Sequence, residues 1–231
     1  MTQPHAPSTE PVTASTLLSL ARLALAALVA VAVIATLIDT ASRSPINPFN
    51  FFGYFTIQSN IAIGVVWLIA AIQGLRGDST GRALSLARGL TTSYILIVGI
   101  VYAVLLAPLG AAGGVPLPWA NTILHVVTPI AGALDWVLAP DRRPLRWRLL
   151  ALVLAYPTVW LTVVLIRGAT DGWVPYPFLH PDQGYGTIAV VCAGIAVTVL
   201  VVGALVFWIS QRTVRSQVLR GALGRSAATT S

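Results

Sequence analysis

Two short polar clusters interrupt long apolar stretches of this 231-residue chain. Residues 54–60 read YFTIQSN, and residues 121–129 read NTILHVVTP. A histidine within an apolar segment is costly to bury and usually marks a functional site. In such surroundings His125 stays neutral and can accept a proton. A hydroxyl such as that of Thr56 needs a neighbouring base of this kind to become a nucleophile, so a threonine–histidine pair is the minimum for acyl transfer.

The same residue types also have a purely structural interpretation. Serine, threonine and asparagine side chains often form hydrogen bonds between membrane helices, and each such bond adds about 1 kcal/mol of packing stability. For Ser59 or Thr128 alone the structural interpretation is the stronger one, whereas for Thr56 the residue type leaves both interpretations open. The elements that position these side chains therefore decide between the two.

Composition indicates a membrane protein built as one helical bundle. The chain is 56% hydrophobic and 9% charged, with a mean hydropathy of +0.82, whereas a soluble domain carries about 25% charged residues. The net charge of +7 could indicate nucleic-acid binding, but the arginines flank apolar segments and form no basic face. We therefore expect no nucleic-acid partner. The single cysteine, Cys192, excludes an internal disulfide and offers no metal cluster.

Six apolar segments are long enough to cross a bilayer, which takes roughly 20 residues. We expect them at about residues 17–38, 54–73, 89–107, 119–139, 149–166 and 185–209. The membrane domain then covers residues 17–209. A disordered tail over residues 1–16 precedes it, and a basic tail over residues 210–231, whose end is also expected to be disordered, follows it.

The arginines predict the orientation of these spans. Twelve of the 14 lie at the N-terminal end of the first span, in the gaps after the second and fourth spans, or in the C-terminal tail. Only Arg43 and Arg167 lie on the opposite side. By the positive-inside rule both termini are cytoplasmic, and the chain is a multi-pass protein of the cell membrane.

This topology brings the two polar clusters to a similar depth. Spans two and four both enter from the outer face, so Thr56 lies about 3–5 Å and His125 about 7–9 Å inside the membrane, and the two can lie side by side. Neighbouring amides could stabilise an oxyanion, and one carboxylate, at the outer end of span one, could orient the imidazole. The candidate supporting residues are the amides Gln58, Asn60 and Asn121, the hydroxyls Ser59 and Thr128, and the carboxylate Asp39.

Five further residues are candidates for a substrate pocket: Tyr54, Asp135, Trp136, Tyr156 and His180. Asp135 lies about 15 Å below His125, which leaves a buried hydrogen bond and contact with a polar substrate group as alternatives. Tyr156 precedes Pro157, which would kink span five and help open a cavity between helices. The loop at 176–181 reads YPFLHP and is either an interfacial cap or a lid, and its histidine is a weak metal signal.

Three of these motifs together resemble a known family. YFTIQSN, LHVVTP (residues 124–129) and YPFLHP, set within six spans, look like six-pass bacterial membrane proteins that are similar to the eukaryotic androgen-induced and androgen-dependent tissue-factor-pathway-inhibitor-regulating proteins. The resemblance covers about residues 17–209. It implies an intramembrane threonine hydrolase of fatty acid esters of hydroxy fatty acids, with Thr56 as the nucleophile and His125 as the essential histidine. This chain has His180 where such relatives often have an acidic residue.

The sequence therefore predicts an all-α, six-helix transmembrane bundle with both termini inside, which hydrolyses lipid esters without a cofactor or a metal. Thr56 attacks the acyl carbon, His125 acts as general base and then as general acid, and the partners are membrane lipids. The alternatives are a non-enzymatic binder of lipids or small molecules, a transporter, and a structural partner within a larger complex. Transport is disfavoured because the polar residues gather in one leaflet. No oligomeric state is indicated.

Overall fold

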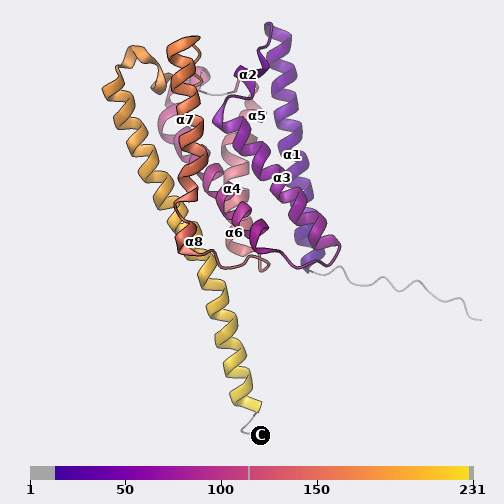
Figure 1. Ribbon diagram of the computed structural model, residues 1–231. Helices are drawn as coiled ribbons and strands as arrows, with labels where there is room; N and C mark the ends of the chain where they lie inside the picture. The colour runs from indigo at the N-terminus through magenta and orange to yellow at the C-terminus, as the bar shows by residue number, and fades with distance from the viewer. Residues whose placement is uncertain (1–13, 114, 229–231) are drawn as a thin grey trace, which may run out of the picture.

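Helices account for all the regular secondary structure of the computed structural model, which describes residues 14–113 and 115–228 apart from the side chains of 111, 112 and 213–228. Six helical segments are long and apolar enough to cross a membrane (Figure 1): Ala14–Arg43, Phe55–Leu75, Arg82–Gly110, Pro118–Leu138, Trp147–Thr170 and Tyr185–Arg212. The prediction of an all-α chain with six helices of membrane-spanning length is therefore confirmed for the described residues.

Two of the six segments are interrupted by wider, π-helical turns. The uninterrupted helices are α1 (Ala14–Arg43), α3 (Phe55–Leu75), α7 (Leu152–Thr170) and α8 (Tyr185–Ala228), and a short α2 (Pro48–Phe51) precedes α3. The third segment consists of α4 (Arg82–Val101), a π-helical turn (Tyr102–Leu106) and a 3-10 stretch (Ala107–Gly113). The fourth consists of α5 (Pro118–Thr122), a π-helical turn (Ile123–Val127) and α6 (Thr128–Leu138).

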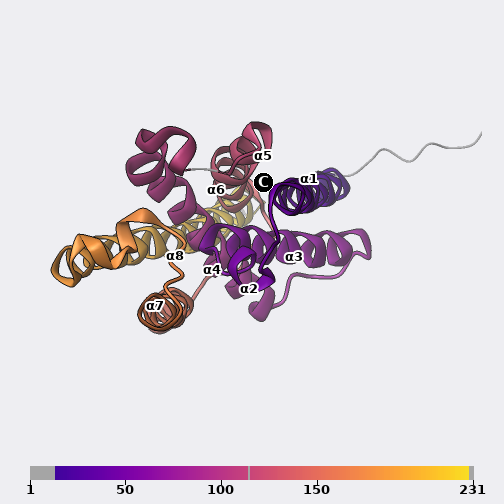
Figure 2. The same cartoon turned by 90° about the horizontal axis from the view of Figure 1, so that it is seen from above.

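Helix α4 lies at the centre of the bundle (Figure 2), where it packs against α3, α6 and α8. Helix α1 lies on one flank along α3, and α7 lies on the other flank against α4 and α8. Helices α3 and α5 begin at one end of the bundle, which we call the site end (Figure 1). Helices α1 and α4 begin at the other, arginine-rich end, where Arg22, Arg82 and Arg88 lie.

Apolar side chains fill the interior and also cover the outside. Trp67 and Ile95 belong to the fully buried core between α3 and α4. On the outer faces, large apolar side chains such as Ile38 and Val190 are mostly exposed. Such a surface fits a hydrocarbon solvent, because the usual exclusion of exposed apolar area applies only to water.

Two helices begin earlier than the sequence predicts. Helix α1 begins at Ala14 instead of residue 17, so the expected N-terminal tail is shorter, and its residues 1–13 lie outside the described part of the chain. Helix α4 begins at Arg82 instead of about residue 89. Because Arg88 is charged, the sequence predicts that it lies outside the span. In the structure its side chain is inside the bundle, where it pairs with Asp135 and Asp141.

The C-terminal tail is helical rather than irregular over most of its length. Helix α8 continues to Ala228, so the disorder expected for the last dozen residues is wrong for residues 220–228, while 229–231 lie outside the described residues. The extension is rich in arginine, leucine, alanine and glutamine, which are strong helix formers, and it contains no proline.

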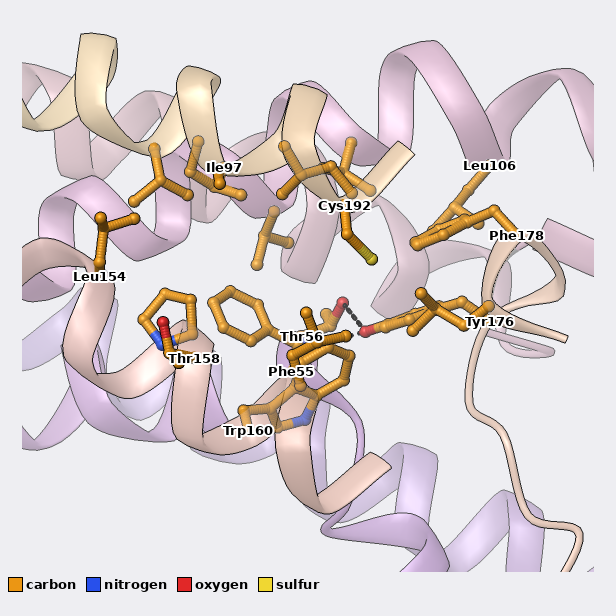
Figure 3. Close-up of a pocket in the computed structure, with 18 residues that line it drawn as sticks. Phe55, Thr56, Ile97, Leu106, Leu154, Thr158, Trp160, Tyr176, Phe178 and Cys192 are labelled. Atoms are coloured by element: carbon orange, nitrogen blue, oxygen red, sulfur yellow. Dashed lines mark hydrogen bonds between the residues drawn. The ribbon is translucent and has the colours of Figure 1, made fainter. Parts of the chain in front are cut away.

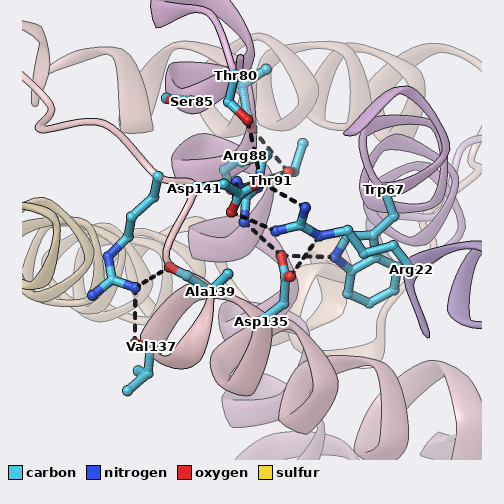
Figure 4. A network of polar contacts seen from close by, with 12 residues as sticks. Arg22, Trp67, Thr80, Ser85, Arg88, Thr91, Asp135, Val137, Ala139 and Asp141 are labelled. Carbon is cyan, nitrogen blue, oxygen red and sulfur yellow. Dashed lines mark hydrogen bonds and ion pairs between the residues drawn. The ribbon is translucent and has the colours of Figure 1, made fainter. Parts of the chain in front are cut away.

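Four charged side chains form a closed ion-pair network near the arginine-rich end (Figure 4). Arg22 of α1 contacts Asp135 of α6 at 2.8 Å and Asp141 of the following loop at 2.7 Å. Arg88 of α4 contacts the same two carboxylates at 3.1 and 3.0 Å. Trp67 Nε1 of α3 also donates to Asp135 at 3.3 Å. The network joins four helices and balances its own charge, which is the condition for burying ions at low cost.

Asp135 and Trp136, both candidate pocket residues, make structural contacts away from Thr56, although Asp135 also lines a cavity at the arginine-rich end. The Asp135 side chain is only 6% exposed and its oxygens are bonded to both arginines, so of its two alternatives the structural one holds. Trp136 is also buried, and its Nε1 donates to the carbonyl of Val206 in α8 at 2.9 Å. Both residues hold helices together at the end opposite Thr56.

Replacing Asp135 with Asn should destabilise the protein by about 3–5 kcal/mol, because two buried arginines would each lose a carboxylate partner. The free energy of unfolding in mixed detergent and denaturant measures this change. Asp39→Asn is the matched control, since it removes the pair between Asp39 and the exposed Arg43 and should change stability little. Equal stability of the two variants would contradict a structural role for Asp135.

The network also predicts a loss of stability in acid. Burial alone would raise the pKa of the Asp141 carboxyl, but its bonds to Arg22 and Arg88 outweigh burial and hold that pKa well below its usual range. A carboxyl whose pKa is lowered by folding stabilises the fold above its unfolded value of about 3.9, and this contribution is lost as the pH falls towards the folded value. The unfolding free energy should therefore fall below about pH 4, and Asp141→Asn should reduce that slope. An unchanged slope would show that Asp141 does not contribute.

Candidate active site

Thr56 lies in the first turn of α3, at the site end. The helix begins after Tyr54, whose carbonyl accepts the first helical hydrogen bond, from the Gln58 N–H at 3.1 Å. The N–H groups before Gln58 have no acceptor within the helix, and that of Thr56 donates to the Tyr176 hydroxyl at 3.2 Å. The 21-residue helix α3 carries a partial positive charge at its N-terminus. This charge stabilises any negative charge that develops beside Thr56.

His125 lies in the second π-helical turn, and Pro129 explains the local structure. A proline has no N–H, and its ring clashes with the carbonyl four residues earlier, which here belongs to His125. The helix widens instead, so that both the N–H and the hydroxyl of Thr128 bond to the Ile123 carbonyl. Gly99 of α4 lets this turn approach, since a Cβ there would lie 2.9 Å from the Pro129 ring. Such turns are rare and occur frequently at functional sites.

The imidazole of His125 is held at both of its nitrogens. Nε2 lies 3.3 Å from Thr56 Oγ1, and Nδ1 lies 3.1 Å from the backbone carbonyl oxygen of Asn121. A carbonyl oxygen can only accept, so Nδ1 carries the hydrogen and Nε2 of the neutral ring presents a lone pair to Thr56. The Thr56 hydroxyl then donates to His125. Nucleophile, base and orienting group thus stand in the order that acyl transfer requires.

A tyrosine ring fixes the plane of the imidazole. Tyr102 stacks on His125 with ring centroids 4.3 Å apart and an interplanar angle of 27°. Tyr102 begins the other π-helical turn, which likewise lies just before a proline, Pro108. The Tyr102 hydroxyl accepts a hydrogen bond from Asn121 Nδ2 at 2.7 Å, and Asn121 Oδ1 accepts one from the Val115 N–H at 3.0 Å. Asn121 therefore orients the histidine through both its backbone and its side chain.

The three amides expected to stabilise an oxyanion are engaged elsewhere. Asn60 Nδ2 donates to backbone carbonyls of α3 and of the π-helical turn, at 2.9 and 3.1 Å. Gln58 Nε2 donates to a backbone carbonyl before α3 at 2.7 Å, and Asn121 Nδ2 donates to Tyr102. Both amide hydrogens of Asn60 are therefore used, whereas for Gln58 and Asn121 the oxyanion role stays a prediction. All three amides hold the elements around Thr56 and His125 together.

Other predicted supporting residues lie away from the pair. Asp39 is wrong as the group that orients the imidazole, because it pairs with Arg43 one turn later and the Asn121 carbonyl occupies that place. Ser59 is buried one turn beyond Thr56. Tyr156 donates to Gln58 Oε1 at 2.8 Å and stacks on Phe55, so it supports the start of α3 from behind.

His180 is also wrong as a pocket residue. It is exposed in the loop before α8 and contacts Asp182 at 3.1 Å. The same loop supplies a residue that the sequence analysis missed. Tyr176 is buried, and its hydroxyl lies 3.2 Å from Thr56 Oγ1. The loop's excess of aromatic residues and prolines was a signal, but sequence alone did not show which ring points inward.

The hydrogen positions of Tyr176, Thr56 and His125 follow from one consistent set of hydrogen bonds. The Tyr176 oxygen already accepts from the Thr56 N–H, and the Thr56 hydroxyl donates to His125, so the Tyr176 O–H is free to donate to Thr56 Oγ1. Burial raises the pKa of Tyr176 to about 12, which keeps this hydroxyl protonated at neutral pH. Tyr176 is thus a hydrogen-bond donor aimed at Thr56 Oγ1.

Two cavities of opposite character meet at Thr56. The apolar cavity, of about 110 Å³, lies between α4, α7 and α8 (Figure 3) and is lined by side chains such as Ile97, Leu154 and Cys192. The polar cavity, of about 400 Å³, lies between the end of α1, α2 and the loop before α8. Thr56, Leu106 and Tyr176 line both cavities, and Tyr54 and His125 line the polar one.

Comparison of the chain with protein-family models, with curated proteins and with solved structures found no match.

The backbone carbonyl of Asn121 predicts the tautomer of His125. Nitrogen-15 spectra of the protein in detergent should show His125 neutral at pH 7, with the hydrogen on Nδ1, and His125→Gln assigns the signal. Thr56→Val should leave the tautomer unchanged, because Asn121 and not Thr56 sets it. A hydrogen on Nε2 would mean that the ring cannot accept the Thr56 proton.

Proposed function

We propose that this chain is a multi-pass membrane hydrolase of lipid esters, with Thr56 as nucleophile and His125 as base. The observation that carries the proposal is the 3.3 Å contact between Thr56 Oγ1 and the unprotonated Nε2 of a buried His125, at the junction of an apolar and a polar cavity. A hydroxyl, a base with a fixed tautomer and an adjoining apolar cavity are the components of ester hydrolysis in a membrane. The chemistry needs no cofactor.

In the first half of the reaction, Thr56 Oγ1 attacks the carbonyl carbon of the ester and His125 Nε2 takes its proton. Such general-base assistance contributes about 10²–10⁴-fold to the rate. The imidazolium that forms keeps its bond to the Asn121 carbonyl, which stabilises the charge. His125 then gives the proton to the leaving alcohol oxygen, and an acyl–Thr56 ester remains.

Tyr176 is the group best placed to stabilise the oxyanion. Its O–H points at Thr56 Oγ1 before the reaction, and that oxygen becomes a poor acceptor once it joins the acyl carbon. The hydrogen bond can then pass to the neighbouring carbonyl oxygen, where negative charge develops. The N-terminus of α3 adds partial positive charge at the same place.

The second half of the reaction repeats these steps with water. Water enters from the polar cavity, which His125 lines, and loses a proton to Nε2 as it attacks the acyl carbon. The bond between the acyl carbon and Thr56 Oγ1 breaks, and His125 returns the proton to that oxygen. The products are a carboxylic acid, an alcohol and the original enzyme.

The distribution of arginines supports a location and an orientation for this site. With both termini cytoplasmic, the site end faces the exterior of the cell membrane, and the ester lies near the outer interface. Only two of the 14 arginines, Arg43 and Arg167, then lie on the outer side. The resemblance of the three motifs to the androgen-induced and androgen-dependent tissue-factor-pathway-inhibitor-regulating proteins supports the same chemistry and the same two residues.

The variants Thr56→Ala and His125→Ala should each lower the hydrolysis of a chromogenic fatty-acyl ester by about 1,000-fold or more, because neither residue works without the other. Turnover by the purified protein in detergent measures the effect. Ser59→Ala, one turn away on the same helix, is the matched control and should retain activity. Undiminished turnover in either of the first two variants would remove that residue from the mechanism.

Tyr176→Phe should lower kcat by about 10²–10³-fold, the usual effect of removing one oxyanion donor, with little change in KM. Tyr185→Phe is the control, since Tyr185 is exposed at the start of α8. Tyr176 could act as an oxyanion donor or only as part of a loop that closes the cavity. Loss of a donor lowers kcat, whereas loss of a closing residue changes KM, so the two constants separate these roles. An unchanged kcat would exclude Tyr176 as a donor to the transition state.

The second candidate function is a non-enzymatic lipid binder, which the apolar cavity alone would also support. A binder should be stabilised against heat by lipid and should show no turnover of any acyl ester. In a binder, Thr56→Ala and His125→Ala should leave the stabilisation by lipid unchanged, and the fixed tautomer of His125 would have no catalytic use.

A further inference from the structure

Only one of the two cavities at Thr56 is lined by the general base. Among the described residues, His125 lines the polar cavity and does not line the apolar one, while Thr56 and Tyr176 line both. This asymmetry matters because His125 Nε2 must reach the oxygen of the leaving alcohol in order to return its proton. The alcohol part of the ester must therefore lie on the side of the polar cavity.

We propose that the apolar cavity binds the acyl chain of the substrate and that the polar cavity binds an uncharged, hydroxylated alcohol of the glycerol type. The inference rests on the proposed hydrolase function. It assigns the protein a substrate class, the neutral acylglycerols, and a direction of binding. The bond that breaks joins the acyl carbon to a glycerol oxygen, and the proton of Thr56 reaches that oxygen through His125.

The apolar cavity has the shape of a slot for one acyl chain. Along α7 it is lined from Leu161 to Leu154, and along α8 from Cys192 to Val199. Seven residues of helix correspond to about 10 Å, so the slot runs from Thr56 towards the middle of the bundle. With a volume of about 110 Å³ it is the smaller of the two cavities and has room for one chain only. Phenyl and aliphatic groups line its walls (Figure 3).

The lateral wall of this slot can admit a lipid. Few residues of helix α7 are buried, and its backbone lies nearest to α4 and α8, although Tyr156 and Trp160 also bond to the start of α3 and the turn before it. Pro157 lies in its middle and lines the slot, and a proline removes one backbone hydrogen bond from the helix. A helix with weak contacts and a proline separates from its neighbours more easily than the tightly packed α1–α3 pair. An acyl chain can therefore enter from the bilayer between α7 and α8.

The polar cavity is suited to hydroxyl groups and not to ions. Beyond the residues of the site itself, its polar lining includes hydroxyl and amide side chains from the end of α1 and from the loop around α2: Thr36, Thr40, Ser44, Asn47 and Asn50. None of the described residues that line it is an arginine, an aspartate or a glutamate. A carboxylate or phosphate on the alcohol would find no counter-ion in this lining, because the guanidinium of Arg167, which bonds to Asn50 Oδ1, is already paired with Asp171. Its burial there would carry a high desolvation cost. Glycerol hydroxyls would find both donors and acceptors.

This substrate class differs from the one that the motif resemblance implies. The alcohol part of a fatty acid ester of a hydroxy fatty acid carries a carboxylate and a second long chain. The polar cavity offers such a carboxylate no cation among the described lining residues. The two classes can therefore be separated by experiment.

Photo-crosslinking tests where the acyl chain lies, independently of turnover. The Thr56→Ala protein in nanodiscs is irradiated with a monoacylglycerol that carries a diazirine at the end of its acyl chain, and the adducts are mapped by mass spectrometry. Adducts should gather on the residues of α7 and α8 that line the slot, and excess unlabelled monoacylglycerol should remove them. These residues are Leu154, Pro157, Thr158, Trp160, Leu161, Cys192, Ile195, Ala196 and Val199. Adducts around the polar cavity, or only on lipid-facing side chains, would overturn the proposed direction of binding.

A substrate panel tests the alcohol. With the acyl chain held constant, the wild-type protein should hydrolyse a monoacylglycerol with kcat/KM about tenfold or more above that for a lysophosphatidate or an ester of a hydroxy fatty acid. Equal or greater activity on either anionic ester would overturn the assignment of a neutral alcohol. Correct crosslinks without hydrolysis of any ester would contradict the hydrolase function and leave the binding site standing, so the two failures are distinguishable.

Filling the slot tests its role in chain length. Ala196→Phe places a ring inside the slot and should lower activity on palmitoyl relative to butyryl glycerol by about tenfold or more. Ala193→Phe is the matched control, because Ala193 is exposed on the same helix and should leave the ratio unchanged. A palmitoyl-to-butyryl ratio that is the same in both variants would exclude this slot as the acyl site.

Discussion

The hydrogen bond between His125 Nδ1 and the Asn121 carbonyl determines the character of the candidate site. It fixes the tautomer, so that Nε2 faces Thr56 with a lone pair. The bond joins residues four apart in the same helical segment. His125 lies within the wider turn before Pro129, and its ring faces Thr56 of α3. A regular helix would place a backbone clash at this point. The imidazole is therefore oriented by local backbone geometry, without the buried carboxylate that orients the histidine of Ser-His-Asp hydrolases.

The two ends of the bundle differ in the kind of polar interaction that they contain. At the arginine-rich end, two arginines and two aspartates join α1, α4 and α6 into a rigid frame. At the site end, neutral hydroxyls, amides and aromatic rings surround Thr56, and charged groups lie on the periphery. This separation is physically reasonable. An ion beside His125 would change the basicity of the ring, whereas balanced ions at the far end cost little and hold the helices in register.

The sequence predicts the architecture well because hydropathy and helix length decide it. All six spans appear, and the topology brings Thr56 next to His125 as depth arguments suggest. The supporting residues are predicted poorly because side-chain partners depend on rotation and packing. Asp39 and Asn121 lie at similar depths, yet a neighbouring Arg43 binds the first and a helical turn directs the carbonyl of the second at the imidazole. Tyr176 comes from a loop, whose path cannot be inferred from periodicity.

The central claim is that Thr56 is a nucleophile activated by His125, and covalent labelling tests it most directly. The purified protein is treated with a fluorophosphonate carrying an alkyl chain, and the modified residue is located by mass spectrometry. The account predicts a single adduct on Thr56 Oγ1 that disappears in His125→Ala. An adduct on Ser59, Thr128 or Tyr176 instead, or labelling of Thr56 that does not depend on His125, would contradict it.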